Sequence, residues 1–477
     1  MSTRRALLFS YVDRYAALAI GIATSMVIAR LLTPTEVGVF SVTMVLSSFT
    51  AALRDLGSGQ YLVQEPELTC DRMRATWTVQ LLSGLVLAIV VGAAAWPVSR
   101  FYEEPRMLPI MGLVALNFAV NPFGSMTYAW LMRHLRFEAL AVMRVSGVAV
   151  NSAVSIALAQ RGWGPISLAY GSLAGTVANA AAARLFRDPD LPRWPGRREL
   201  RRVLAFGSRL SASSILRTAA EGSAELLLGK LQSLTAAGFF SRANGLAQMF
   251  NRLMLDAALV VAQPLFARTL RDGCSLLPLF LRALSYLCAI GWAFFIGLAL
   301  LAEPTVRLLY GSQWSASVEI ARVLCITAMI ALPAALCPVA LVAMGAVKLH
   351  LRLTAATAFI TIMGAAAGSL FGMLGTAFGL LGAQAINTSL WLRGTLAQPG
   401  LGTTGLLSTL GRSAALTGIT SAVPVTLLLA HGSDALALWA PPAAAALGSA
   451  VFVFSSLLLK HPIAAEWQPI VRRLRGR

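Results

Sequence analysis

The sequence predicts an all-α polytopic membrane protein with about 14 transmembrane helices: two six-helix lobes and two appended C-terminal helices. Three observations predict this class: an apolar composition, apolar windows spaced along the whole chain, and an internal repeat. Of the 477 residues, 57% are hydrophobic and 12% are charged, whereas a soluble domain is roughly 45–50% apolar and about 25% charged. This composition excludes a soluble protein, a disordered tail and a fibrous repeat.

Apolar windows of about 20 residues, the length that a spanning helix needs, follow one another along the chain. The first six begin near Tyr11, Glu36, Thr76, Met107, Ala139 and Trp163. The next six begin near Val203, Leu234, Leu276, Ala316, Leu351 and Met373, and the last two near Ser413 and Ala435. Prolines are expected to bend or break four of these helices, at Pro122, Pro264, Pro333 and Pro338.

Basic residues in the connecting segments predict the orientation of the chain. With the N-terminus in the cytoplasm, 26 Lys and Arg fall in inward-facing segments and 5 in outward-facing ones. Such a bias toward the cytoplasmic side orients membrane proteins. We therefore expect both termini in the cytoplasm, together with the densest basic segment, residues 184–202. The net charge of +19 is accounted for by these loops, and nucleic-acid binding is the weaker interpretation.

A shift of the sequence by 200 positions superposes residues 30–46 on residues 230–246, with six identities and one Arg/Lys exchange in 17 positions. Both segments lie at the predicted turn from the first to the second span of a six-span block. The repeat predicts an N-terminal lobe over 1–190, a C-terminal lobe over 191–400, and two appended helices with a basic cytoplasmic tail over 401–477. Two copies that enter the membrane in the same direction are related by a pseudo-two-fold axis along the membrane normal. Chance similarity between apolar helices is the alternative.

Ionisable residues inside predicted spans are expensive and usually face a cavity or a partner. They gather in the first two helices of each block, at Asp13, Arg14, Arg30, Arg209, Arg217, Glu221, Glu225, Arg242, Arg252 and Asp256. One interpretation is a cationic, water-filled cavity for an anionic headgroup, because the arginine fork bonds two phosphate oxygens at once. The other is structural: Arg217 pairs with Glu221, Arg252 with Asp256, and the remaining arginines reach the headgroups.

Enzyme signatures are missing from the sequence. It contains no HExxH, GxSxG or P-loop motif and no acidic metal cluster. The four histidines lie at loop edges, and the five cysteines lack metal-site spacing. We therefore expect no catalytic residue, no metal and no cofactor.

Several motifs resemble those of bacterial polysaccharide-synthesis flippases, which belong to the multidrug/oligosaccharidyl-lipid/polysaccharide exporter superfamily. The opening motif is Ala29-Arg-Leu-Leu-Thr-Pro-Thr-Glu-Val-Gly-Val-Phe. The other motifs are Asp55-Leu-Gly-Ser-Gly with Leu62-Val-Gln, Leu131-Met-Arg with Arg136-Phe, Leu227-Leu-Leu-Gly-Lys-Leu, Gly238-Phe-Phe-Ser-Arg-Ala, and Leu309-Tyr-Gly-Ser-Gln-Trp-Ser-Ala. Together they extend over roughly residues 10–460.

The resemblance implies an inner-membrane flippase of polyprenyl-diphosphate-linked oligosaccharides that works by alternating access. It implies membrane lipids, a polysaccharide polymerase and other export components as partners, and no nucleic acid. By the same resemblance, the diphosphate contacts fall on Arg14, Arg30, Arg209, Arg217 and Arg242. Coupling to a proton or sodium ion would use Glu221, Glu225 or Asp256, each of which is alternatively the plain partner of a neighbouring arginine.

Other functions are also consistent with the sequence. A multidrug exporter of the same superfamily would favour carboxylates and aromatic residues over arginines in its cavity. An integral-membrane polymerase, ligase or glycosyltransferase would carry a long periplasmic loop, and a passive scaffold is the remaining class. The residues leave open the coupling ion, the oligomeric state and whether the glycan is O-antigen, capsule or exopolysaccharide.

The orientation can be tested with reporter fusions. Fusions after Leu191 and after Arg472 are expected to report a cytoplasmic position, and a fusion at Gly432 a periplasmic one, because the basic residues hold these loops inside. Paired phosphatase and fluorescent-protein reporters give the measurement. A periplasmic signal after Arg472 would contradict an even number of spans.

Overall fold

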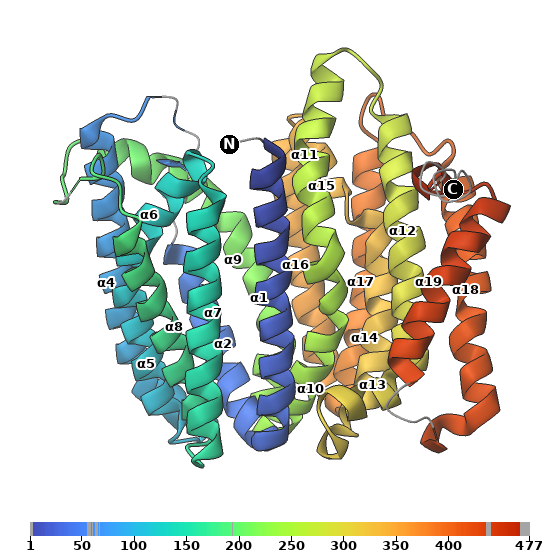
Figure 1. Cartoon of the computed structure of the whole chain (residues 1–477), viewed down its shortest axis with the longest axis horizontal. Helices are drawn as coiled ribbons and strands as arrows, with labels where there is room; N and C mark the ends of the chain where they lie inside the picture. The colour runs from blue at the N-terminus through green and yellow to red at the C-terminus, as the bar shows by residue number, and fades with distance from the viewer. Residues whose placement is uncertain are drawn as a thin grey trace. The chain divides into compact units, whose positions relative to one another are not determined.

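The computed structural model describes the backbone of residues 3–54, 59, 61–62, 65, 67–192, 194–435 and 440–467. Side chains are described within these ranges except at 3–14, 52–54, 201–202, 204–212 and 431–435. Every regular element in the described ranges is a helix (Figure 1). Contacts divide the chain into two compact units, Met1–Gly238 and Phe239–Arg477.

The first unit holds eight long helices of the described chain. They are α1 (Thr3–Leu31), α2 (Pro34–Arg54), α4 (Cys70–Tyr102), α5 (Met107–Val120), α6 (Pro122–Arg133), α7 (Phe137–Gln160), α8 (Ile166–Leu185) and α9 (Leu200–Leu231). α7 packs on α8 and α1, α4 packs on α5, and α9 lies on α2 and α4. Glycines allow the closest of these contacts, since a Cβ at Gly171 would lie 1.8 Å from Ser155 Oγ.

The second unit takes most of α10 (Leu234–Ala247) and everything after it. Its elements are the π-helix η1 (Asn251–Leu255), α11 (Asp256–Arg271), α12 (Leu277–Leu300), α13 (Ala302–Leu309), η2 (Ser312–Trp314), α14 (Ser317–Ala331), η3 (Leu332–Ala334), α15 (Cys337–Ala343), α16 (Val347–Ser369), α17 (Gly372–Leu396), α18 (Leu406–Ala435) and α19 (Ala440–Leu458). A buried cluster of aromatic rings joins α11 and α12 through Phe266, Phe280 and Phe295. Glycines again mark the tightest pair, α16 with α17, where a Cβ at Gly379 would meet the Gly364 carbonyl at 2.1 Å.

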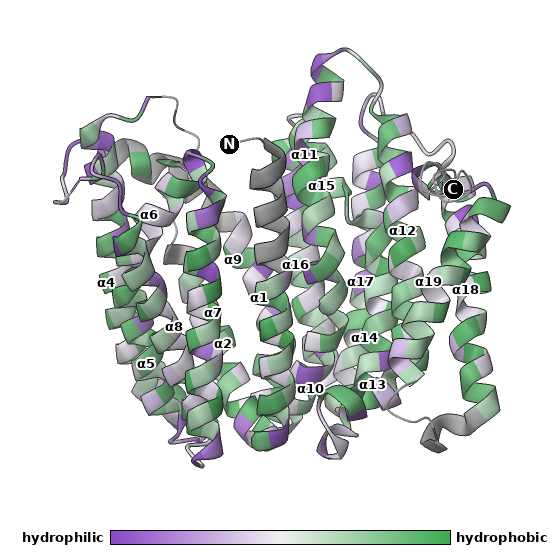
Figure 2. Cartoon of the chain, viewed as in Figure 1, coloured by the Kyte–Doolittle hydropathy of each residue, from purple (hydrophilic) through white to green (hydrophobic). Residues whose placement is uncertain are grey.

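Eight helices among the described residues are long and apolar enough to cross a membrane, or nine if the bent pair α5–α6 is one span. Apolar residues cover most of the helix lengths, while polar residues gather toward the ends (Figure 2). The predicted membrane protein is confirmed, and fourteen spans remain a prediction. Five other helices fall short of this test. The described part of α1, Tyr15–Leu31, is apolar but short, and α2, α8, α9 and α17 carry charged or small polar residues among their apolar ones.

Of the four prolines that were expected to bend or break a helix, two lie at a break in the structure. Pro122 begins α6 at a 47° bend from α5. Pro333 lies in the 3-10 turn η3 that separates α14 from α15. Pro264 is accommodated inside α11, and Pro338 lies in the first turn of α15, where its missing N–H costs nothing.

Repeat-equivalent residues meet in the first unit, where the α1–α2 turn approaches the α9–α10 turn. Thr35 and Thr235, 200 positions apart, share a hydrogen bond of 2.7 Å between their hydroxyls. A Cβ at Gly38 would lie 1.7 Å from the Leu234 carbonyl oxygen, and one at Gly238 would lie 2.0 Å from that of Pro34. This reciprocal contact supports the predicted repeat, while the lobe boundaries at 190 and 400 remain proposals.

Gly38→Ala is expected to destabilise the protein, because the atoms that a methyl group would meet belong to the backbone and do not rotate away. Overpacking of this kind costs about 1–3 kcal/mol. The measurement is the midpoint of thermal unfolding in detergent. Gly21→Ala in α1 is the matched control, since a Cβ at Gly21 would have no heavy atom within 4 Å. Equal midpoints for the two variants would contradict the close contact.

Candidate functional site

Three of the predicted site residues lie on one face of α9, at Arg217, Glu221 and Glu225. The Arg217 Nη1 atom is 3.6 Å from Glu221 Oε1, and the two side chains are 71% and 61% exposed. Exposed pairs of this kind are held weakly. The Arg217 guanidinium on α9 therefore stays largely accessible beside its carboxylate partner.

Glu225, one turn further along α9, is in a different environment. It is buried, and the Ser41 hydroxyl of α2 donates a hydrogen bond to its Oε2. Burial of a carboxylate is tolerated where polar partners satisfy its oxygens. Glu225 therefore belongs to the α2–α9 contact rather than to an open surface, and a change in its protonation would be felt at that contact.

Arg242 of α10 is enclosed by aromatic rings of the second unit. Its guanidinium carbon lies 5.5 Å from the Tyr310 ring centroid and 5.4 Å from that of Trp314. Both rings are buried. They are held by the turn between α13 and α14, where Gly311 adopts φ 98°, a conformation that glycine accepts without strain. The motif that begins at Leu309 thus supplies a pocket wall for an arginine.

The other predicted residues occupy separate places. Arg30 is exposed in the last turn of α1. Asp256 is exposed at the first position of α11, directly after the π-helix that carries the exposed Arg252. The side chains of Arg14 and Arg209 lie outside the described residues. Among the predicted set, contacts within one unit bring together Arg217 with Glu221, and Glu225 with its α2 neighbour.

Arg144 is an intramembrane arginine that sequence reasoning missed. It lies inside α7, a helix apolar enough to span, and its Nη2 donates to the Tyr128 hydroxyl of α6 at 2.9 Å. The signal was available in the sequence, since an arginine within an apolar run is costly and indicates a partner or a cavity. It was missed because it has no counterpart in the first two helices of either block.

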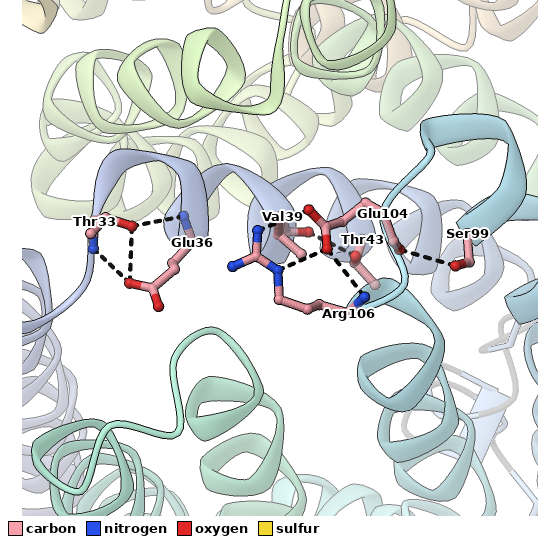
Figure 3. A network of polar contacts seen from close by, with 7 residues as sticks. All are labelled: Thr33, Glu36, Val39, Thr43, Ser99, Glu104 and Arg106. Atoms are coloured by element: carbon pink, nitrogen blue, oxygen red, sulfur yellow. Dashed lines mark hydrogen bonds and ion pairs between the residues drawn. The ribbon is translucent and has the colours of Figure 1, made fainter.

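Polar contacts join side chains at the start of α2 and on the α4–α5 loop (Figure 3). Thr33 and Glu36 form a reciprocal cap at the start of α2, with Thr33 N–H donating to Glu36 Oε2 at 2.8 Å. On the α4–α5 loop, Arg106 donates two bonds to Glu104, at 2.7 and 2.8 Å, and holds the pKa of that carboxyl below its ordinary value. Lys230 of α9 donates to the Phe101 carbonyl in the last turn of α4 at 2.5 Å.

Metal ligation is not supported by the described residues, which contain no group of three or more His, Cys, Asp or Glu placed to hold an ion. The five cysteines are free thiols, and three of them are buried in the second unit. The predicted site positions that the structure describes therefore hold arginines, carboxylates and their hydroxyl and aromatic neighbours.

Arg242→Ala is expected to lower the thermal stability, while Arg217→Ala leaves it unchanged. Each stacked ring is worth about 0.5–2 kcal/mol to a cation, depending on its desolvation. Loss of both contacts should lower the unfolding midpoint by at least about 2 °C. Thermal unfolding followed by size-exclusion chromatography measures this. A stable Arg242→Ala variant would argue against a structural role for the aromatic enclosure.

Comparison with known proteins places the chain in a family. The sequence profile of a family described as "Polysaccharide biosynthesis protein" matches residues 27–319. The lipopolysaccharide biosynthesis protein WzxC of Escherichia coli (strain K12) is 22% identical over 385 residues, which are 78% of this chain and 76% of that protein. The succinoglycan biosynthesis transport protein ExoT of Rhizobium meliloti (strain 1021) is 24% identical over 315 residues, 64% of this chain and 62% of that protein.

The fold has a solved counterpart. The lipid II flippase MurJ, in an inward closed conformation, matches with a TM-score of 0.77 at 12% identity, over 95% of this chain and 99% of that one. This likeness concerns the fold. The match to the family profile extends over more than half of the residues and agrees with the resemblance of the sequence motifs. The chain is a multi-pass membrane protein that belongs to the polysaccharide biosynthesis protein family.

Proposed function

We propose that this protein flips polyprenyl-diphosphate-linked oligosaccharide repeat units from the cytoplasmic to the periplasmic leaflet of the inner membrane. The repeat units would serve the synthesis of O-antigen, capsule or exopolysaccharide. Membership of the family, relatives named for polysaccharide biosynthesis and transport, and the MurJ-like fold support a flippase of lipid-linked oligosaccharides.

Fourteen spans are part of the proposal. To the nine spans counted above, α1, α2, α8, α9 and α17 would add the remaining five. Residues 1–190 and 191–400 would form the two lobes, with residues 401–477 appended and both termini in the cytoplasm. Helices that line a polar cavity do not need a fully apolar surface, which accounts for the polar and small residues in α2, α8, α9 and α17.

The exposed Arg217 is the observation that carries the proposal. A charged side chain at mid-membrane costs at least about 2.5–3.5 kcal/mol, so its presence on α9 needs a compensating partner or a water-filled cavity. Glu221 contributes one contact at 3.6 Å and leaves most of the guanidinium accessible. A diphosphate offers several oxygens to the planar fork and would bind it more strongly than this single carboxylate.

The remaining arginines take different parts in this proposal. Arg30, exposed at the end of α1, would contact the diphosphate. Arg14 of α1 and Arg209 of α9 would contact it as well. Arg242 would act through the wall that it forms with Tyr310 and Trp314, by keeping the cavity cationic. Glu221, Glu225 and Asp256 are the candidates for coupling to a proton or sodium ion. Of these, Glu225 is the one whose charge would act on the contact between two helices.

The membrane potential would assist outward movement. A diphosphate carries about two negative charges, and the cytoplasm is the negative side, so outward movement is downhill by up to about 4.6 kcal/mol at a potential near 100 mV. Arginines that move with the cargo would cancel part of this. Return of the empty cationic cavity is favoured by the same potential, and nucleotide hydrolysis is not required.

A multidrug exporter of the same superfamily is the alternative. Organic cations would be bound by carboxylates and aromatic faces. On α9 and α10 the described arginines are instead either exposed, as Arg217 is, or already stacked on the aromatic rings, as Arg242 is. An anionic cargo fits this arrangement better.

The test is flipping of a polyprenyl-diphosphate oligosaccharide by purified protein in liposomes, with an imposed potassium-diffusion potential and no nucleotide. Exposure of the sugar to an added lectin reports the rate. We expect the rate to depend on the sign of the potential. Arg217→Ala should lower it about 10–100-fold, because hydrogen bonds to charged groups are worth about 1.5–3 kcal/mol. Arg217→Lys should restore part of the rate, since an ammonium lacks the fork.

Arg322→Ala is the matched control. Arg322 also pairs with a carboxylate on its own helix, Glu319 of α14, at 2.5 Å, and it has no part in the proposed site. It should flip at the wild-type rate. A rate that ignores the sign of the potential would remove the electrical step, and full activity of Arg217→Ala would remove Arg217 from the site.

A further inference from the structure

The segment between α8 and α9 is a folded surface and not a loose charged linker. Leu191 is buried against Trp77 and Met73 of α4. The Thr78 hydroxyl donates to the Gly196 carbonyl at 2.7 Å and accepts from the Gly196 N–H at 2.9 Å. These contacts hold the segment against α4 at Leu191 and at Gly196.

The end of α8 and the segment after it carry exposed arginines and exposed apolar side chains. Trp194 is 76% exposed and Leu185 is 82% exposed. Arg184, Arg197 and Arg198 are exposed near them in the sequence, and Arg198 keeps an exposed pair with Asp71 of α4, with Nη1 3.6 Å from Oδ2. We call Trp194, Leu185 and the three arginines the basic loop surface. Exposed arginines are stable in water. An exposed tryptophan is not stabilised by water, and indole rings favour the headgroup layer of a membrane.

The position of the segment along α4 agrees with that layer. Thr78 and Leu82 share a face of the helix with the exposed apolar residues Leu85, Val86 and Ile89, which mark a lipid-facing stripe. Trp96, 61% exposed, lies near the other end of α4, with the Arg100 guanidinium 5.1 Å from its ring centroid.

The length of the stripe sets the depth of both ends. Thr78 and Trp96 are 18 positions apart in the sequence, or about 27 Å along the helix axis. The hydrocarbon core of a bilayer is about 30 Å thick. If Trp96 marks one headgroup layer, the segment clasped by Thr78 lies at the other. The basic loop surface then borders lipid headgroups directly above the lipid-facing stripe.

We propose that the basic loop surface binds anionic phospholipid headgroups of the surrounding bilayer. The arginines bond the lipid phosphate, and Trp194 and Leu185 insert among the upper acyl chains. This site lies on the outer, lipid-facing side of α4, apart from the arginines proposed to bind the transported cargo. It would tie the α8–α9 connection to the membrane surface and would favour bilayers that contain phosphatidylglycerol.

The test uses the full-length protein in vesicles of phosphatidylcholine with a fixed minor fraction of phosphatidylglycerol. The bromines that quench tryptophan are placed either on the phosphatidylglycerol or on an equal amount of the phosphatidylcholine. The emission of Trp194 is obtained by subtracting the spectrum of Trp194→Phe. Brominated phosphatidylglycerol should quench this emission at least about twofold more strongly, since arginines enrich anionic lipid near them.

Two double variants separate this surface from positive charge in general. Arg184→Gln/Arg197→Gln should abolish the preference for phosphatidylglycerol and keep the quenching by phosphatidylcholine. Arg271→Gln/Lys348→Gln, which removes two exposed charges from the second unit, should keep the preference. Equal quenching by the two lipids in the wild type, no quenching by either lipid, or loss of the preference in the second variant would each overturn the proposal.

Discussion

Close approach of helices through small residues is the constraint on which this fold depends. In a bilayer the hydrophobic effect does not drive the association of helices, so van der Waals packing and hydrogen bonds must stabilise it. Glycines on α7, α8, α16 and α17 let neighbouring backbones touch, and Gly38 with Gly238 does the same at the turns of the repeat. Large side chains are then free to face lipid, which explains their high exposure on α4.

Charged side chains in this framework are accommodated in three different ways. Arg242 is stacked between buried rings, Glu225 is bonded by a hydroxyl of the neighbouring helix, and Arg217 keeps a weak pair and an accessible guanidinium. The first two arrangements stabilise the contacts in which they lie. Only the third leaves a charge available to a ligand, and for this reason the proposed transport function rests on Arg217 more than on the number of arginines.

Much of the fold could be predicted from the sequence, because apolar length and proline positions are local signals. The windows near Met107 and Ala139 fall on α5 and α7, and Pro122 marks the bend before α6. The 200-residue shift predicted the repeat, and the contact between the equivalent residues Thr35 and Thr235 is seen only in the structure. Which charges are buried could not be predicted, since Glu221 and Glu225 share one helical face and differ only in what α2 places beside them.

Other features depend on tertiary contacts that leave no local pattern. The enclosure of Arg242 needs a turn some 70 residues later in the chain, and Arg144 needs Tyr128 from the preceding helix. The segment 184–202 has the composition of a charged linker. The hydrogen bond between Thr78 and Gly196, which holds it against α4, could not be predicted from its residue types.

The free-energy cost of an arginine in a membrane protein depends on its depth in the bilayer, and this divides arginines into two classes. At the headgroup layer an arginine costs little free energy, since water and lipid phosphate both solvate it. In a spanning helix the same residue is destabilising unless something compensates it. Trp194 distinguishes the basic loop surface from other arginines near helix ends. An exposed indole is not stabilised by water but is stabilised in the headgroup layer of a membrane. In the proposed function, where α9 spans the membrane, the exposure of Arg217 is the corresponding observation for the second class. In both proposals the argument for a ligand is a side chain whose contacts within the protein do not offset the free energy of its exposed position.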